Sequence, residues 1–203
     1  NELKWEARSR RLLIADSNPK VLTNNLDYDF VVLPETNFNN FQEILSILKK
    51  ENIKYVIPTR DGELTFFAKH KELFKNNGIT VMISDSDTIE ICNDKLLFFE
   101  KLSKFNLPVI ETSENLDDLV CSDSNRYVVK ERFGSGSKSL GLNLDYLSAK
   151  KHSYQIHKPI FQQFIEGLEY SVDVFASESS EMESLVIRER NLVFDGESVV
   201  STI

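Results

Sequence analysis

Residues 127–141 read YVVKERFGSGSKSLG. An apolar run ends at Lys130, a loop rich in glycine and serine follows, and a second extended run begins at Gly141, which predicts an antiparallel hairpin. A P-loop and a dinucleotide-binding GxGxxG turn both join a strand to a helix, and this stretch fits neither plan. Two interpretations stay open at this point: an ordinary solvated loop, or a flap whose backbone amides close over phosphate oxygens.

Short apolar runs alternate with helical patterns ahead of this hairpin. The spacing of apolar residues predicts helices over 40–52 and 60–78, and in the second we expect Leu64, Phe67 and Leu73 to share the buried side. Strands are predicted at 11–16 and 29–34 ahead of the first helix, at 54–58 between the two helices, and at 79–85 after the second. Such alternation is typical of a parallel sheet with helices on its faces.

The pattern changes after residue 85. One helix is predicted to begin at residue 86 and to end ahead of Pro108, because the residue before a proline avoids the helical conformation. A further helix is predicted over 145–157, with Asp145 near its start. The remaining segments are strand-like, at 127–133, 141–144, 159–177 and, as two strands, within 183–203. This second part therefore has a mixed α+β pattern.

Composition narrows the classes of function. The chain has 203 residues, a net charge of −8 and an isoelectric point near 5.0, which argues against a general nucleic-acid-binding surface, since that needs a basic face. We see neither a secretory signal nor an apolar run long enough to span a membrane, and the two cysteines lack metal-binding spacing. We therefore expect a cytoplasmic protein with neither nucleic-acid nor membrane partners.

Three later stretches carry a resemblance to a known family. They are NDKLLFFEKLSKFNLPVIET (93–112), YVVKERFGSGSKSLG (127–141) and PIFQQFIEGLEYSVDV (159–174), in that order. Together they resemble the ATP-grasp superfamily, and most of all the branch that includes the carbamoyl phosphate synthetase large chain. KYVIPTRDGELTFFAKH (54–70) resembles the parallel-sheet domain that precedes the ATP-grasp fold in that branch. The resemblance covers nearly the whole chain.

The resemblance implies a fold class and a domain plan. The fold class is α/β, with a parallel-sheet domain followed by an α+β ATP-grasp lid and the start of the second ATP-grasp subdomain. The expected boundaries place the first domain at 1–88, the lid subdomain with its glycine-rich flap at 89–158, and the start of a truncated last subdomain at 159–203.

The resemblance also assigns a phosphate site. Lys95 matches the basic residue that reaches the nucleotide phosphates from the first helix, and Lys130 matches the lid residue that contacts the α-phosphate. The flap over the β- and γ-phosphates corresponds to Gly134, Ser135, Gly136, Ser137 and Lys138. Two lysines from separate positions can neutralise a triphosphate. Glu131 and Ser139 depart from the family pattern, which has proline and often glycine at these two positions.

An adenosine site is implied downstream of the flap. Backbone groups of Gln163, Phe164 and Ile165 match the hinge strand that recognises the adenine edge. Glu169 matches the acid that holds the ribose hydroxyls, a role that suits a carboxylate because it only accepts hydrogen bonds. The alternative for Glu169 is a cross-strand ion pair. Arg188 and Arg190 lie where the family often keeps arginine, without a defined role.

Several candidates have simpler structural interpretations. Lys95 is also compatible with a solvent-facing position on a helix. Asp61 and Glu63 are better explained as helix-capping residues than as paired catalytic acids. The three histidines are scattered over polar stretches, so we expect no catalytic role for them.

The implied activity is ATP-dependent ligation with ATP and Mg²⁺. A small-molecule carboxylate would be activated as an acyl phosphate and attacked by an amine or a similar nucleophile, in a protein that forms a possible homodimer. Metal ligands are expected beyond residue 203 and not within this chain, so we expect this fragment to be inactive alone. The alternative is a non-catalytic module that binds a nucleotide or phosphorylated ligand. Dinucleotide binding by residues 1–90 is disfavoured because that part lacks a glycine fingerprint.

Overall fold

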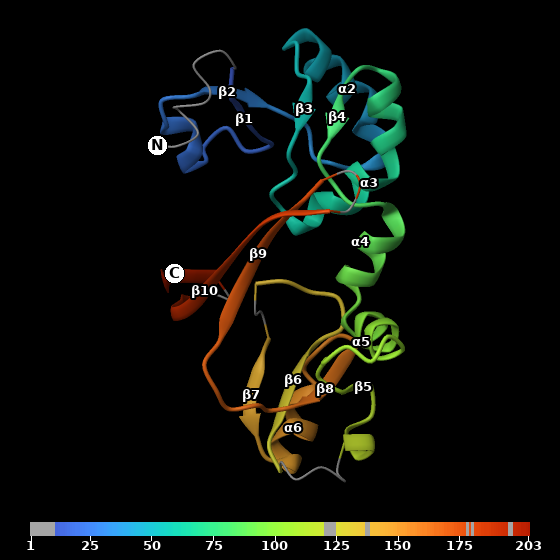
Figure 1. The fold of residues 1–203 in the computed structure, drawn as a ribbon, viewed down its shortest axis with the longest axis vertical. Helices are drawn as coiled ribbons and strands as arrows, with labels where there is room; N and C mark the ends of the chain where they lie inside the picture. Colours follow the sequence, from blue (N-terminus) through green and yellow to red (C-terminus); the bar gives the residue numbers. More distant parts are fainter. Residues whose placement is uncertain (1–10, 120–124, 137–138, 178, 180, 195–196) are drawn as a thin grey trace. The chain divides into compact units, whose positions relative to one another are not determined.

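The computed structural model describes residues 11–119, 125–136, 139–177, 179, 181–194 and 197–203. The chain divides into two compact units, Asn1–Ile89 and Glu90–Ile203. Figure 1 shows the course of the chain through helices and strands, and each unit is described below by itself.

The strands of the first unit are parallel, as the sequence predicts. β1 (Leu13–Asp16) pairs with β2 (Asp29–Val32), and β3 (Tyr55–Val56) pairs with β4 (Thr80–Val81). Among the described residues these four strands form two separate parallel pairs. A short 3₁₀ helix, η2 (Leu22–Asn25), lies between β1 and β2.

Two helices supply most of the core of the first unit. η3 (Phe38–Asn40) leads into α2 (Phe41–Lys50), and α3 (Asp61–Asn76) follows β3. Their apolar faces meet in a core that also includes β4, with fully or almost fully buried Ile44, Leu48, Phe66, Phe67, Phe74, Ile79 and Val81.

The prediction that Leu73 lies on the buried side of α3 is wrong. Leu73 is 48% exposed, whereas Phe74 is completely buried. An α-helix has about 3.6 residues per turn, so Phe74 returns to the side of Phe67 after two turns, and Leu73 points elsewhere. Phe74 packs its ring against Phe41, with the centroids 5.1 Å apart.

The predicted single helix after residue 85 is two helices. α4 (Ser86–Asn93) ends at Asp94, whose extended backbone (φ −108°, ψ 102°) breaks the helix, and α5 (Lys95–Ser103) begins at the next residue. The carboxylate of Asp94 caps α5 by accepting hydrogen bonds from the backbone N–H groups of Leu96 and Leu97, each at 3.1 Å. α5 therefore starts with a defined capping residue, and it ends well before Pro108.

The central sheet of the second unit is antiparallel. Its strand order is β5 (Thr112–Ser113), β8 (Pro159–Gln163), β6 (Tyr127–Glu131) and β7 (Gly141–Leu144). α6 (Tyr146–Ser153) follows β7, and Asp145 caps it, as predicted, by accepting from the N–H of Ser148 at 2.8 Å. η4 (Leu116–Leu119) contributes to the core, whose buried members are Leu116, Leu119, Tyr127, Val129, Ala149, Ile156 and Phe161.

A second antiparallel sheet contains the last strands. β10 (Met182–Phe194) lies between β9 (Tyr170–Ala176) and β11 (Glu197–Thr202), and the strands of this sheet are drawn in orange to red in Figure 1. The prediction of two strands within 183–203 is confirmed. The strand-like run 159–177 is two strands, β8 and β9, which belong to different sheets.

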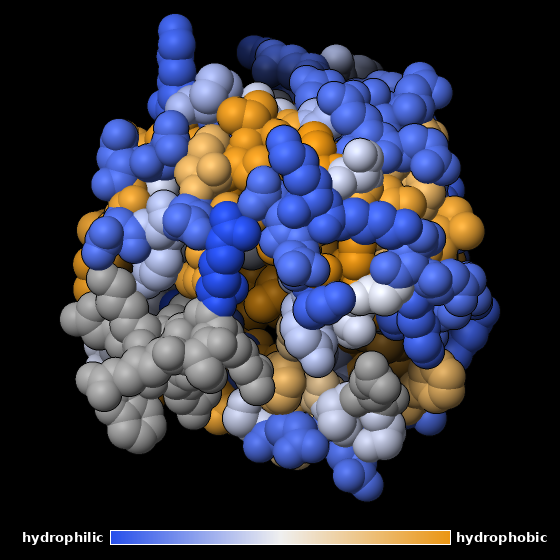
Figure 2. All heavy atoms as spheres, turned by 90° about the horizontal axis from the view of Figure 1, so that it is seen from above, coloured by the Kyte–Doolittle hydropathy of each residue, from blue (hydrophilic) through white to orange (hydrophobic). Residues whose placement is uncertain are grey.

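The surface agrees with the charged composition. Figure 2 shows one face on which hydrophilic side chains predominate and hydrophobic areas lie between them. The longest helix of the described residues, α3, has 16 residues, and among those residues no helix has the length and apolar character needed to cross a bilayer.

Candidate functional site

The glycine-rich stretch forms the connection of the predicted hairpin. β6 and β7 pair antiparallel, with Tyr127 opposite Leu144 and Val129 opposite Gly141. Gly136 has a positive φ of 70°, a conformation that glycine adopts without strain. Gly134 and Ser135 are exposed at the start of this connection. Ser137 and Lys138, which the resemblance also assigns to the flap, lie outside the described residues.

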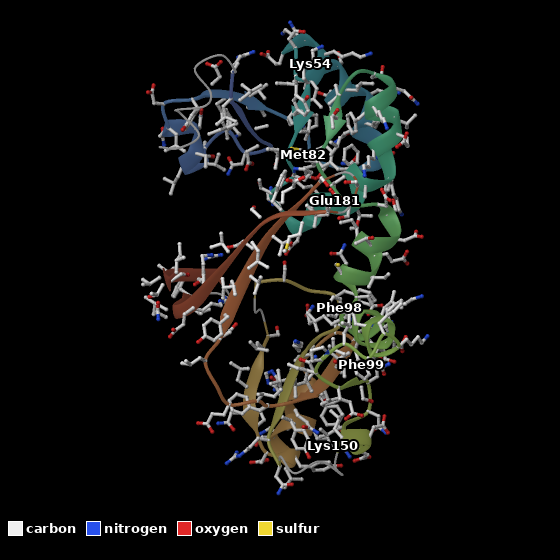
Figure 3. The ribbon with its side chains drawn as sticks, viewed as in Figure 1. Lys54, Met82, Phe98, Phe99, Lys150 and Glu181 are labelled. Atoms are coloured by element: carbon white, nitrogen blue, oxygen red, sulfur yellow. The ribbon has the colours of Figure 1, made fainter. Side chains whose placement is uncertain are left out.

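Lys95 lies against the start of the loop. Its ammonium group donates hydrogen bonds to the backbone oxygen of Gly134 at 2.6 Å and to that of Arg132 at 3.3 Å. The side chain is half-buried at the first residue of α5, one turn before Phe98 and Phe99, which Figure 3 labels on this helix. Lys95 is therefore directed at the loop rather than at bulk solvent.

Lys130 brings a second positive charge to the same place. It lies in β6, opposite Ile160 of β8, and its side chain is half-buried. Burial lowers the pKa of the Lys130 ammonium, and the positive charge of Lys95 lowers it further. Two cations that destabilise each other at the base of a glycine-rich hairpin form a favourable environment for an anion.

Asp94, which is buried, and Arg132, which is half-buried, form an ion pair beside these lysines. The Nε and terminal nitrogen atoms of Arg132 donate to the two carboxylate oxygens of Asp94, at 2.8 and 2.7 Å. Asp94 is only 6% exposed. The hydrogen bonds from Arg132 are the main reason that the pKa of the Asp94 carboxyl is lowered. Another terminal nitrogen of Arg132 donates to Glu114 at 2.9 Å.

This ion pair was not predicted from the sequence. Two signals were available. Asp94 directly precedes Lys95 at a position typical of a helix N-cap, and Arg132 lies two residues after Lys130. Their contact links segments that are far apart in the sequence, and neither segment alone indicates its partner.

The expected hinge residues continue β8. Gln163 is the last residue of that strand and lies opposite Tyr127 of β6. The backbone N–H of Phe164 donates to the carbonyl of Arg126 at 2.9 Å, so an N–H that binds adenine in this segment has to come from another residue. Ile165 follows and is 64% exposed.

Glu169 forms the cross-strand ion pair that the sequence left open. Its carboxylate accepts a hydrogen bond from the guanidinium of Arg190 in β10, and its backbone oxygen accepts from the N–H of Arg190 at 2.8 Å. The Glu169 side chain is 61% exposed. Contact with Arg190 and access to a ligand are therefore compatible.

Arg188 belongs to a second pair on the same sheet. Its guanidinium donates to both carboxylate oxygens of Asp173 in β9, at 2.5 and 3.2 Å, and to the hydroxyl of Ser201 at 3.1 Å. The hydrogen bonds from Arg188 lower the pKa of Asp173. This pair joins all three strands of that sheet.

Two histidines make structural contacts. The imidazole Nε2 of His152 lies 3.0 Å from the backbone oxygen of Ser139, at the far end of the glycine-rich loop. His70 stacks on Phe41 with ring centroids 4.5 Å apart, and its Nδ1 lies 2.8 Å from the backbone oxygen of Phe66. His70 is thus part of the packing of α2 against α3.

The capping interpretation of Glu63 is confirmed. Its carboxylate accepts from the backbone N–H groups of Thr59 at 2.8 Å and Arg60 at 3.3 Å, at the start of α3. Asp61 lies in the first turn of the same helix, where a negative charge is favourable.

Within the part of the chain that the structure describes, no group of three or more histidine, cysteine, aspartate or glutamate side chains is placed to hold a metal ion. The described residues therefore do not by themselves fit a protein-bound metal site.

Comparison with known families identifies two matches along the chain. The family model described as ATP-grasp domain matches residues 92–201, and the one described as PylC-like, N-terminal domain matches residues 2–82. The carbamoyl phosphate synthase large chain of Clostridium acetobutylicum is 22% identical over 204 residues. That match covers 92% of this chain and 18% of the relative, so the chain spans about a fifth of the relative's length.

Solved structures with the same fold include two nucleotide complexes. A biotin carboxylase from Campylobacter jejuni, described as a complex with beta-gamma-ATP, has a TM-score of 0.67 at 10% identity, over 98% of this chain and 49% of its own. The biotin carboxylase domain dimer of the 2-oxoglutarate carboxylase from Hydrogenobacter thermophilus, in complex with MgADP, ADP and bicarbonate, has a TM-score of 0.63 at 12% identity, over 94% and 47%. These likenesses confirm the expected fold class.

Proposed function

This chain belongs to the ATP-grasp family, whose domain model matches more than half of it, and on that basis we propose that it is the nucleotide-binding part of an ATP-dependent ligase. The chain covers 18% of its carbamoyl phosphate synthase relative and about half of the matched solved structures. The activity of the whole protein is accordingly part of the proposal.

The observation that carries the proposal is the position of two lysines at one glycine-rich hairpin. Lys95 reaches the loop from α5, with its ammonium group 2.6 Å from the backbone oxygen of Gly134. Lys130 lies in β6, and burial together with the charge of Lys95 lowers its pKa. A polyphosphate bound between them would offset this repulsion, and lysine serves such a ligand as a point charge.

The remaining nucleotide contacts follow from the same assignment. We place the β- and γ-phosphates under the loop from Gly134 to Lys138 and the adenine against the backbone of Gln163 to Ile165. Glu169 accepts hydrogen bonds from the ribose hydroxyls with the carboxylate oxygen that Arg190 does not bind. A carboxylate has enough lone pairs to hold the guanidinium and a hydroxyl together.

The reaction we infer is the activation of a carboxylate. An oxygen of the substrate carboxylate forms a bond to the γ-phosphorus of ATP, and the bond between that phosphorus and the bridging oxygen of ADP breaks. An amine then attacks the carbonyl carbon of the acyl phosphate and releases phosphate, losing a proton to solvent or a base. Lys95 and Lys130 hold the phosphates in place and neutralise charge as ADP leaves.

Other features of the whole protein belong to the same proposal. Mg²⁺ accompanies ADP in the Hydrogenobacter thermophilus structure, and we propose that it enters this site with the nucleotide and finds its protein ligands elsewhere. We propose a small-molecule carboxylate and an amine as substrates, a cytoplasmic location and a possible homodimer. The domain plan is a first domain over 1–88, a lid over 89–158, and the start of the next subdomain from 159.

Calorimetry tests the phosphate site directly. ATP and tripolyphosphate are titrated, with and without Mg²⁺, into the chain and into its Lys130→Ala variant. We expect binding that weakens about 10- to 100-fold in the variant, since hydrogen bonds to charged groups contribute about 1.5–3 kcal/mol. Lys104→Ala is the matched control, because Lys104 is exposed at the other end of α5 and should leave the affinity unchanged.

Two results would count against the proposal. Equal ATP affinity in the wild-type chain and Lys130→Ala would show that the hairpin is not the phosphate site. If the full-length protein bound ATP but formed neither ADP nor ligated product with any carboxylate, the alternative of a non-catalytic nucleotide-binding module would replace the ligase.

A further inference from the structure

We propose that Arg132 is a positioning residue that fixes the distance between Lys95 and Lys130. Its side chain holds Asp94, the residue before Lys95, and thereby holds the start of α5 against the glycine-rich loop. This inference rests on the proposed function, because it assigns Arg132 a role in the same phosphate site. In this role Arg132 acts through Asp94 and the start of α5, and it does not itself donate a hydrogen bond to the ligand.

Arg132 connects the two lysine-bearing segments through its side chain and also through its backbone oxygen. Its guanidinium binds both carboxylate oxygens of Asp94. Its backbone oxygen lies 3.3 Å from the backbone nitrogen of Lys95 and 3.3 Å from the ammonium nitrogen of the same residue. Residues 94 and 95 are thus both held by one residue of the loop segment. A shift of α5 away from the loop would break all of these contacts together.

The surroundings of Arg132 hold it in this orientation. Its backbone N–H donates to the carbonyl of Lys158 at 3.0 Å, and its guanidinium lies over the ring of Phe133 at 5.2 Å. The side chain keeps little exposure, at 24%. Arg132 is therefore anchored independently of α5 and can act as the fixed partner.

Electrostatics explains why this contact of Arg132 with Asp94, a clamp on the start of α5, is needed. Two ammonium groups repel each other, most strongly where the environment is poorly solvated. Burial and the charge of Lys95 both lower the pKa of Lys130. When no anion lies between them, the repulsion of the two ammonium groups therefore favours their separation. A buried carboxylate that is hydrogen-bonded to an arginine and to two backbone N–H groups of α5 resists that movement.

The geometry favours positioning over direct ligand binding. Nε and one terminal nitrogen of Arg132 donate to Asp94, and the other terminal nitrogen donates to Glu114. All three nitrogen atoms are thus already bonded to carboxylates. Three of the five N–H donors of the guanidinium are thus engaged, and the negative charge of the two carboxylates disfavours a phosphate beside them.

Three variants and one control test the clamp. Arg132→Ala removes it, and Arg132→Lys keeps the charge but cannot bind both carboxylate oxygens of Asp94. Asp94→Asn keeps a good helix cap and removes the carboxylate charge, so it protects against a simple failure to fold. Arg11→Ala is the matched control, since Arg11 also binds two carboxylates, those of Asp29 and Glu51, within the first unit.

Two readouts separate this inference from the proposed function. The first is the dissociation constant for tripolyphosphate. The second is the pKa of Lys130 without ligand, from the pH dependence of its amine labelling measured by mass spectrometry. Far-UV circular dichroism and thermal unfolding check that each variant is folded.

The expected outcome is a change in both readouts. Arg132→Ala and Asp94→Asn weaken tripolyphosphate binding about tenfold or more, the scale of a charged hydrogen bond, and raise the pKa of Lys130 because Lys95 moves away. Arg132→Lys restores part of each, and Arg11→Ala changes neither. Folded variants in which the pKa of Lys130 stays at the wild-type value would overturn the clamp. A wild-type chain that binds no polyphosphate would refute the proposed function, while the labelling result would still decide the clamp.

Discussion

Arg190 in β10 binds the carboxylate of Glu169, and its backbone N–H binds the carbonyl oxygen of the same residue at 2.8 Å. This double contact fixes the direction of a carboxylate that is otherwise well exposed. It is consistent with a ribose-binding role, because the guanidinium occupies one oxygen of Glu169 and restrains the other.

Glu169→Gln should therefore weaken ATP binding and leave tripolyphosphate binding unchanged. We expect a loss of about tenfold, since a charged hydrogen-bond acceptor is replaced by a neutral amide. Calorimetric titration with both ligands measures the difference. Glu183→Gln, at an exposed position of β10, is the control. Equal losses for ATP and tripolyphosphate would remove the ribose assignment.

Gly141→Ala should destabilise the second unit. A Cβ atom at this position would lie 2.7 Å from Cδ2 of His152 and 2.7 Å from Cδ1 of Leu144. Both side chains would have to move, and His152 would lose its contact with Ser139. We expect a fall of about 1–3 kcal/mol in the free energy of unfolding, measured by urea denaturation.

Gly167→Ala is the matched control for that change. A Cβ atom there would meet no described heavy atom within 4 Å, so the free energy of unfolding should stay within about 0.5 kcal/mol of wild type. Similar losses at both glycines would show that the packing of α6 against β7 is not as described.

The Asp94–Arg132 pair should make stability depend on acidic pH. The pKa of Asp94 in the folded chain lies below its ordinary value of 3.8, so the unfolded chain binds more protons between these two values. The stabilisation is complete above the ordinary pKa and is lost as pH falls through the lowered pKa. Urea unfolding over an acidic pH series should show this loss in the wild-type chain.

Asp94→Asn should remove that component of the pH dependence. The stability difference between wild type and this variant should shrink as pH falls. Asp87→Asn, at an exposed position in the first turn of α4, should give a much smaller change with pH. A wild-type advantage over Asp94→Asn that is constant with pH would contradict the ion pair.

Phe74→Ala and Leu73→Ala should differ sharply although the residues are neighbours. Phe74 is completely buried against the rings of Phe41, Phe66 and Phe67, and truncating such a residue costs about 3–5 kcal/mol. Leu73 is 48% exposed, so its truncation should cost less than about 1 kcal/mol. Denaturant unfolding of both variants decides whether Phe74 or Leu73 belongs to the core.

Local sequence patterns predicted the features that depend on a few adjacent residues. The hairpin around the glycine-rich loop, the cap at Asp145 and the paired strands near the end of the chain are of this kind. So is the helix-capping role of Glu63, because side chains at a helix start bind their own backbone. The family, and the full fold class that it implies, came instead from the resemblance of three ordered stretches to the ATP-grasp superfamily.

Features that depend on contacts between distant segments were not predicted. The break at Asp94 lies inside a continuous helical pattern, and its carboxylate is stabilised by Arg132, 38 residues away. The alternation of apolar and polar residues over 159–177 did not show where β8 ends and β9 begins, because strands of both sheets follow this alternation. The roles of Lys95, Lys130, the hinge residues and Glu169 stay predictions, and Ser137 and Lys138 lie outside the described part of the flap.

Binding of a polyphosphate at this hairpin would also be a protonation event at Lys130. In the empty site Lys130 holds its proton less firmly than a lysine in water, and a bound polyphosphate would raise its pKa again. In alkaline solution the protein would therefore take up protons from the buffer as it binds, and its affinity would fall as pH rises. The heat of binding would then vary with the ionisation enthalpy of the buffer, and in Lys130→Ala this variation would disappear.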